Sequence, residues 1–177
     1  MGIPYYFSYL LNSNKDIIKR INILRNKDTK IQLYFDLNCL IHPVCEKIIK
    51  YYNVEVGKQL NEEKLEEDMI QSVIKNIEKL CDLIQPSDLI YIAIDGVPPL
   101  AKIKQQRNRR YLSIYRRKLL DKYNTVKNNK IYWDKNAITP GTKFMDKLDI
   151  KLKDFLINRF KYKKNVEFSL SDEPGEG

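Results

Sequence analysis

Two short apolar runs, each closed by an aspartate, constrain the fold of this 177-residue chain more than any other feature. They occupy residues 31–36 (Ile-Gln-Leu-Tyr-Phe-Asp) and 89–95 (Leu-Ile-Tyr-Ile-Ala-Ile-Asp). Both are too short for amphipathic helices and are dominated by apolar and aromatic residues, so we expect buried strands. Between them, apolar residues recur at helical spacing from Leu65 to Ile84, and Asn61 can cap that helix. This order of elements predicts a parallel strand pair with a helix over one face of the sheet.

The remaining chain predicts two more helices and a third strand. A basic helix should begin near Leu100 and end around Asn124, with Ile103, Tyr111 and Ile114 facing the core. Thr142 can cap a second helix, whose apolar stripe reaches Phe160, and residues 166–170 alternate like a strand. Since the chain has no internal repeat and no interdomain linker, we expect a single domain over residues 1–177.

The charge of the chain is concentrated in one segment. Lys and Arg number 32 against 23 acidic residues, and nine of these cations, with one acid, lie between Lys102 and Asn124. This clustering favours a polyanionic partner such as nucleic acid, although a solvated basic helix without a specific ligand is the alternative. The odd number of cysteines favours a reducing, intracellular compartment, and no run is apolar enough to span a membrane.

Asp36 and Asp95 are the candidate metal ligands. Each is the last residue of an expected strand, and the carboxyl ends of parallel strands are where open α/β sheets bind ligands. Carboxylates that converge there usually share a cation, and hard oxygen ligands beside a phosphate suit Mg²⁺, with Mn²⁺ as an alternative. The competing interpretation is that each aspartate only ends its strand and caps the following turn.

The basic helix carries a candidate phosphate site. Its residues Lys102, Gln106, Arg109 and Arg110 fall within an arc of about 100°, and together offer guanidinium forks, an ammonium and an amide donor. The helix begins a few residues after Asp95, so this face should lie beside the metal site. His42 is the only histidine, and a general acid/base, a base-stacking platform and a packing residue are all open roles for it.

Six motifs occur together in one order. They are Met1-Gly2-Ile3-Pro4, Tyr34-Phe35-Asp36-Leu37-Asn38 with Ile41-His42, Ile94-Asp95-Gly96-Val97-Pro98, Ala101-Lys102 through Gln105-Gln106-Arg107 and Arg109-Arg110, Ile138-Thr139-Pro140-Gly141-Thr142 with Phe144-Met145, and Pro174-Gly175-Glu176-Gly177. Over its whole length the chain resembles the amino-terminal catalytic region of Xrn-type 5′→3′ exoribonucleases. The resemblance implies a three-layer PIN/flap-nuclease-like α/β domain with a mostly parallel central sheet, incomplete here. It also implies hydrolysis of 5′-monophosphorylated RNA by metal-ion catalysis.

The resemblance assigns roles to the matching residues. It implies that Asp36, Asp95 and Glu176 are catalytic and bind the metal. It places the 5′-phosphate pocket at Lys102, Gln106, Arg109 and Arg110, and makes His42 a stacking platform for the first base.

The chain also departs from the family pattern. Cys39-Leu40 replaces a commoner Gly-Ile pair, and Leu100 stands where a basic residue is often found. The pattern continues beyond Gly177 with further acids, so we expect a fragment or a truncated relative of a longer enzyme. The alternatives are an RNA 5′-end binding module that does not cleave, and a structure-specific DNA 5′ nuclease of the same fold.

Overall fold

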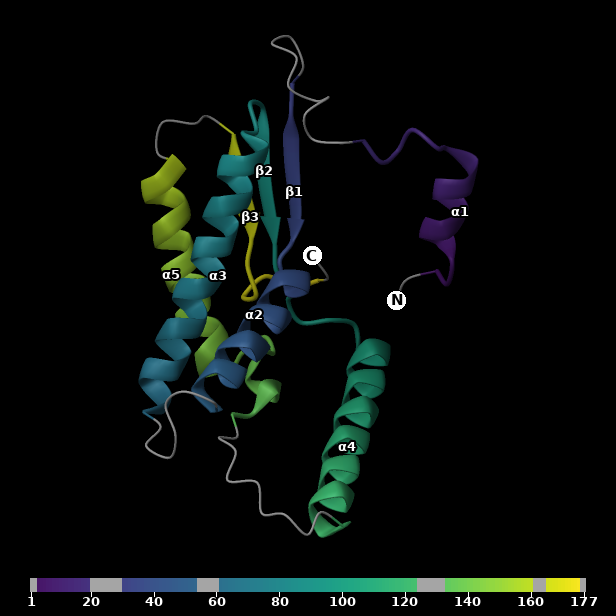
Figure 1. Cartoon of the computed structure of the whole chain (residues 1–177), viewed down its shortest axis with the longest axis vertical. Helices are drawn as coiled ribbons and strands as arrows, with labels where there is room; N and C mark the ends of the chain where they lie inside the picture. Colours follow the sequence, from purple (N-terminus) through teal and green to yellow (C-terminus); the bar gives the residue numbers. More distant parts are fainter. Residues whose placement is uncertain (1–2, 20–29, 54–60, 124–132, 161–164, 176–177) are drawn as a thin grey trace.

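A parallel sheet of three strands organises the chain in the computed structural model, which describes residues 3–19, 30–53, 61–123, 133–160 and 165–175 (Figure 1). The strands are β1 (Gln32–Asp36), β2 (Leu89–Ala93) and β3 (Val166–Ser169), and β2 lies between the other two. Both pairings are parallel. The predicted α/β class is therefore confirmed, and all three predicted strands are present. The second is shorter than expected, since β2 ends at Ala93 and Asp95 follows the strand instead of ending it.

Two helices separate β1 from β2. The predicted helix is α3 (Glu62–Ile84), and the Asn61 side chain caps it by accepting a hydrogen bond from the Lys64 N–H at 3.2 Å. The other is α2 (Asn38–Tyr51), which the sequence did not predict because Pro43 lies inside it. Proline lacks the N–H that would close a helical hydrogen bond, so the local pattern there does not favour a helix.

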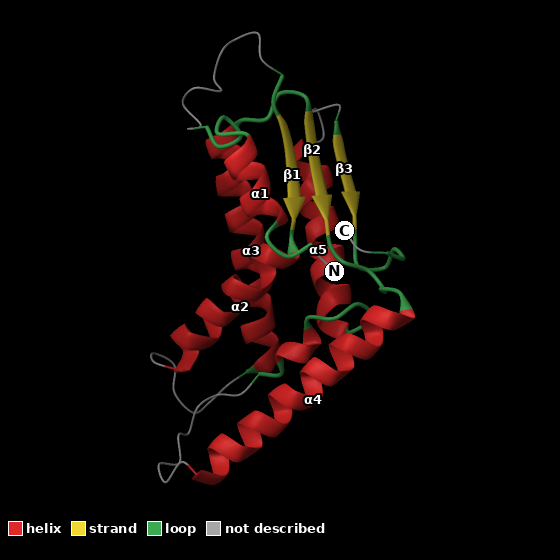
Figure 2. Cartoon of the chain, turned by 90° about the vertical axis from the view of Figure 1, so that its right-hand side faces the viewer, coloured by secondary structure: helices red, strands yellow, loops and turns green. Residues whose placement is uncertain are grey.

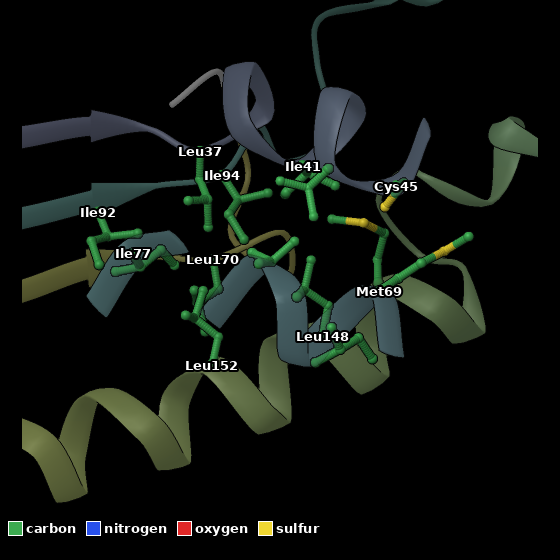
Figure 3. Packing of buried hydrophobic residues seen from close by; sticks show 14 of the residues in the cluster. Leu37, Ile41, Cys45, Met69, Ile77, Ile92, Ile94, Leu148, Leu152 and Leu170 are labelled. Atoms are coloured by element: carbon green, nitrogen blue, oxygen red, sulfur yellow. The ribbon is translucent and has the colours of Figure 1, made fainter. Parts of the chain in front are cut away.

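The core lies between the sheet and the helices α2, α3 and α5 (Lys143–Phe160). Figure 3 shows Ile92 and Ile94 of the β2 segment converging with Ile77 of α3 and Leu152 of α5. Ile41 of α2 joins the same cluster and is fully buried. Helix α5 begins as predicted, because the Thr142 Oγ1 accepts a hydrogen bond from the Met145 N–H at 3.4 Å.

In the described residues these helices cover only one face of the sheet (Figure 2). The opposite face carries Tyr34 and Tyr91, whose ring centroids lie 5.9 Å apart, and Tyr34 is 61% exposed. The described part of the chain thus forms two of the three layers that the resemblance implies.

Two helices lie outside the core. Helix α1 (Tyr6–Ser13) buries no residue, and α4 (Leu100–Tyr123) extends away from the carboxyl end of the sheet (Figures 1 and 2). The expectation that Tyr111 faces the core is wrong, because Tyr111 is 63% exposed. Helix α4 runs beyond the edge of the sheet (Figure 2), and none of its described side chains is buried. No helix in the described ranges combines the length and the apolar character needed to cross a membrane.

A buried polar pair joins α5 to the segment after β3. The Ser171 hydroxyl donates to Asp149 Oδ2, and both residues are buried. Asp149 Oδ1 is also buried, and has no hydrogen-bond partner among the described residues. Burial raises the pKa of Asp149 above its ordinary value of 3.8, while the Ser171 hydrogen bond opposes this shift. The carboxyl of Asp149 is therefore protonated more readily in the folded state than in the unfolded chain.

Asp149→Asn is expected to raise the free energy of unfolding at pH 7. A carboxyl whose pKa is raised on folding stabilises the fold fully below its unfolded pKa, and this stabilisation is lost as the pH rises through the folded pKa. Asparagine remains neutral, so the advantage of the variant should shrink as the pH falls towards 3.8. Urea unfolding of both proteins at several pH values measures this. Asp154→Asn, at an exposed position of α5, is the control, and a variant that is less stable at pH 7 would contradict the assignment.

Candidate active site

The ends of β1 and β2 bring Asp36 and Asp95 to the same edge of the sheet. Asp36 is in register with Ala93, and the Leu37 N–H donates to the Ala93 carbonyl at 2.8 Å. Asp95 lies two residues beyond Ala93, the last residue of β2, and therefore at the same edge of the sheet as Asp36. The pKa of the Cys39 thiol is affected by both acids. Its hydrogen bond to Asp36, the charge of Asp36, burial and the charge of Asp95 all raise the pKa of its thiol.

Asp36 also has a local structural role. Its Oδ1 accepts a hydrogen bond from the Asn38 N–H at 3.1 Å, and its Oδ2 lies 3.4 Å from the Cys39 Sγ. These contacts fix the turn from β1 into α2. The capping role left open by the sequence is therefore present for Asp36. The capping hydrogen bond leaves part of the carboxylate accessible, because Asp36 is exposed.

The segment after β3 crosses the end of β2 beside Asp95. A Cβ built on Gly96 would lie 1.7 Å from the Glu173 carbonyl oxygen, so this close approach requires glycine. The Gly175 N–H donates to the Val97 carbonyl at 3.3 Å. Glu176, the third predicted acid, lies outside the described residues.

A pocket of about 370 Å³ opens next to this edge. Four parts of the chain form its wall: the start of α2, the end of β2, one face of α4, and the connection from the short helix η3 (Lys135–Ala137) into α5. The lining residues are Asn38, His42, Asp95, Gly96, Pro98, Gln106, Arg109, Arg110, Ser113, Lys135, Asn136, Ile138, Thr139, Pro140 and Met145.

Five of the eight residues predicted for the site lie in this pocket. They are Asp95, His42, Gln106, Arg109 and Arg110. Lys102 lies four residues before Gln106 on the same face of α4, outside the pocket lining. Asp36 lies at the neighbouring strand end, also outside the lining. The structure thus places one predicted acid in the same pocket as three members of the predicted phosphate site.

The wall formed by η3 and the start of α5 was not predicted as part of the site. The Arg110 Nη2 donates to Thr139 Oγ1 at 2.8 Å, and the Thr139 hydroxyl donates to the Asn136 carbonyl at 2.6 Å. This pair of bonds holds the Arg110 guanidinium across the pocket. The motif Ile138-Thr139-Pro140-Gly141-Thr142 was the available signal, but by itself it indicates only a turn.

The pocket wall favours the neutral form of the His42 imidazole. Loss of surrounding water lowers its pKa most, the positive charges of Arg109 and Lys135 lower it further, and Glu46 acts in the opposite direction. Its pKa is therefore below its ordinary value of 6.5, which favours the neutral form of the ring. A neutral imidazole offers a flat face for stacking.

The acids fit part of a site for a hard cation. The described residues contain no group of three or more acidic, histidine or cysteine side chains arranged to hold a metal ion. Asp36 and Asp95 supply carboxylate oxygens, which Mg²⁺ prefers, at one edge of the sheet. The neighbouring Cys39 favours its thiol form, because its pKa is raised. The donor chemistry therefore fits Mg²⁺ at this edge.

Comparisons with known proteins give one consistent family. The family model described as "XRN 5'-3' exonuclease N-terminus" matches residues 1–177. "5'-3' exoribonuclease 2" of Schizosaccharomyces pombe is 33% identical over 168 residues, which cover 82% of this chain and 16% of that protein. The protein of the same name from Candida glabrata is 34% identical over a region that covers 82% of this chain and 15% of that protein. "5'-3' exoribonuclease 2 homolog" of Drosophila melanogaster is 30% identical over a region that covers 100% of this chain and 23% of that protein. The chain thus spans less than a quarter of the length of these relatives.

Gly96→Ala is expected to lower the free energy of unfolding by about 1–3 kcal/mol, the usual cost of overpacking a filled site. The new methyl group would meet the Glu173 carbonyl, which is backbone and cannot rotate away. Val97→Ala is the control, because the neighbouring Val97 is 57% exposed and its truncation should cost less than about 0.5 kcal/mol. Urea unfolding measures both variants, and equal small effects would contradict the close approach.

Proposed function

Since this chain belongs to the XRN 5′-3′ exonuclease family, we propose that the protein removes nucleotides in the 5′→3′ direction from RNA with a 5′-monophosphate, by metal-ion catalysis. Residues 1–177 would form a single domain, the amino-terminal part of the catalytic region. The observation that carries this proposal is the pocket shared by Asp95, His42, Gln106, Arg109 and Arg110. The odd number of cysteines supports an intracellular location.

In this proposal Asp36 and Asp95 hold Mg²⁺, for which Mn²⁺ is an alternative. Glu176, outside the described residues, is proposed as a third acid from the family resemblance alone. The bound metal would supply an activated water and stabilise charge on the scissile phosphate. The register of β1 and β2 supports the role of the first two acids, because it sets Asp36 beside Ala93, two residues before Asp95.

The α4 face binds the terminal phosphate in this proposal. Arg109 and Arg110 can each present a fork of N–H donors to phosphate oxygens, and Gln106 can donate from its amide. Arg110 is already held by Thr139, so less conformational entropy is lost when phosphate binds. Lys102, on the same helix face, would add positive charge near the pocket entrance.

His42 would stack on the first base. Stacking needs a flat ring rather than a charge, and the lowered pKa favours the neutral form of the ring. The neighbouring Arg109 would hold the phosphate of the same nucleotide, since both side chains line one pocket. The two contacts would bind one 5′-terminal nucleotide at a time.

Asp36→Asn and Asp95→Asn in the full-length protein are expected to slow nucleotide release by about 100-fold or more, because each removes a charge that stabilises the transition state through the metal. Binding of 5′-monophosphorylated RNA should remain nearly unchanged. Release of labelled nucleotide and fluorescence anisotropy measure the two properties. The control is Asp172→Asn, at an exposed position of the segment after β3.

The same assay separates the alternatives. Wild-type protein that binds RNA but releases no nucleotide with Mg²⁺ or Mn²⁺ would be a binding module. Cleavage of flap DNA without cleavage of RNA would identify a DNA 5′ nuclease. Normal turnover in either aspartate variant would exclude the metal assignment.

Arg109→Ala is expected to reduce the preference for a 5′-monophosphate over a 5′-hydroxyl end by about 10-fold or more, because a hydrogen bond to a charged group contributes about 1.5–3 kcal/mol. Lys118→Ala is the control, since Lys118 lies on the outer part of α4 and is not among the pocket residues. Lys118→Ala should weaken the binding of both RNAs by the same factor. Dissociation constants for the two RNAs without divalent metal measure the preference, and an unchanged ratio in Arg109→Ala would place the phosphate elsewhere.

A further inference from the structure

Lys135 brings a cation to the pocket from η3, a part of the wall separate from α4. It is the first residue of η3 and lines the same pocket as His42, Arg109 and Arg110. Neither its place in the sequence nor the family resemblance indicated this role. Its ammonium group forms an ion pair with the Glu46 carboxylate of α2.

Lys135 and His42 line the same pocket, and the positive charge of Lys135 also affects the imidazole. Lys135 and Arg109, from different elements, both lower the pKa of the imidazole, and Glu46 raises it. Glu46 lies four residues after His42, on the same face of α2. His42 is therefore close to an arginine of α4 and to the ion pair that links η3 with α2.

The ion pair leaves Lys135 available to a ligand. The side chains of Lys135 and Glu46 are 55% and 47% exposed. Exposed ion pairs contribute only about 0–1 kcal/mol, so this pair is easily broken. A phosphate monoester carries about two negative charges at neutral pH, against one on Glu46. The long, flexible lysine side chain can exchange one partner for the other.

We propose that Lys135 is a specificity-determining residue that adds its charge to the 5′-phosphate pocket, and that Glu46 limits this contribution by competing with the phosphate. This inference rests on the proposed function, because it assigns a further contact to the same terminal phosphate. The pocket then surrounds the phosphate with Arg109 and Arg110 from α4 and Lys135 from η3. RNA whose 5′ end carries no phosphate would not form this contact, so Lys135 would not raise the affinity for it.

A second ion pair provides a matched comparison. Lys151 of α5 pairs with Glu67 of α3 at 3.4 Å, with side-chain exposures of 49% and 45%. Neither residue lines the pocket. Lys151→Ala therefore removes the same charge and the same kind of contact as Lys135→Ala, at a different place on the protein.

The experiment measures dissociation constants of full-length protein for one RNA with a 5′-monophosphate and for the same RNA with a 5′-hydroxyl, without divalent metal. Lys135→Ala should lower the preference for the monophosphate about fivefold, which corresponds to the loss of about 1 kcal/mol. Lys135→Arg should retain the preference, and Lys151→Ala should not change it. Glu46→Gln should raise the preference, because Lys135 then has no competing carboxylate.

The opposite signs at the two partners make the proposal testable. Both Lys135→Ala and Glu46→Gln break the ion pair, so a purely structural role would change the preference in the same direction. A lower preference in Glu46→Gln, an unchanged preference in Lys135→Ala, or an equal loss in Lys151→Ala would each overturn the proposal.

Arg109→Ala separates this inference from the proposed function. If Arg109→Ala loses the preference while Lys135→Ala keeps it, the phosphate pocket stands and the role of Lys135 is wrong. If the wild-type protein does not prefer the monophosphate, the proposed substrate itself is wrong.

Discussion

The parallel pairing of β1 with β2 is the constraint on which the rest of the site depends. Its register sets Asp36 beside Ala93 and continues through the bond from the Leu37 N–H to the Ala93 carbonyl. A slip by one residue would turn every side chain of a strand to the opposite face. Buried Leu33 and Ile90 prevent that slip, because each would leave the core. The position of the two acids is therefore set by hydrophobic burial several residues away.

The end of β2 joins the acids to the phosphate pocket. Within a few residues the chain passes from Asp95 through Gly96, where the Glu173 carbonyl lies too close for any side chain, into the start of α4. Helix α4 buries no described side chain, so its own packing does not determine where its cations lie. The hydrogen bond from Arg110 to Thr139 ties it to the wall formed by η3 and the start of α5. The pocket thus depends on a polar contact between α4 and the segment that contains Thr139, because hydrophobic packing does not join them.

The sequence predicted the elements with clear periodicity and caps, and it failed where neighbouring residues carried no such signal. The three strands and helices α3, α4 and α5 were predicted, although β2 ends at Ala93, before Asp95. Helices α3 and α5 were clear because Asn61 and Thr142 cap them and their apolar stripes are buried in the core. Helix α2 was missed because of Pro43, and Tyr111 was expected in a core that does not extend to α4. In the pocket, Arg109 and Arg110 could be found because they share one helix face. Thr139 could not, because it lies 29 residues from its partner Arg110.

The charge distribution gives the proposed reaction its direction. Asp95 lies on one side of the pocket, near Asp36, whereas Arg109 and Arg110 lie on α4. A terminal phosphate is attracted to the cations, and without a bound dication it is repelled by the carboxylates. In the proposed function, the next phosphate along the RNA would then reach the acids, where the metal site is proposed. A strand in the reverse orientation would place a neutral hydroxyl among the cations and lose that attraction. In the proposed function, the cations of α4 and the acids at the sheet edge would therefore together favour binding of the 5′ end.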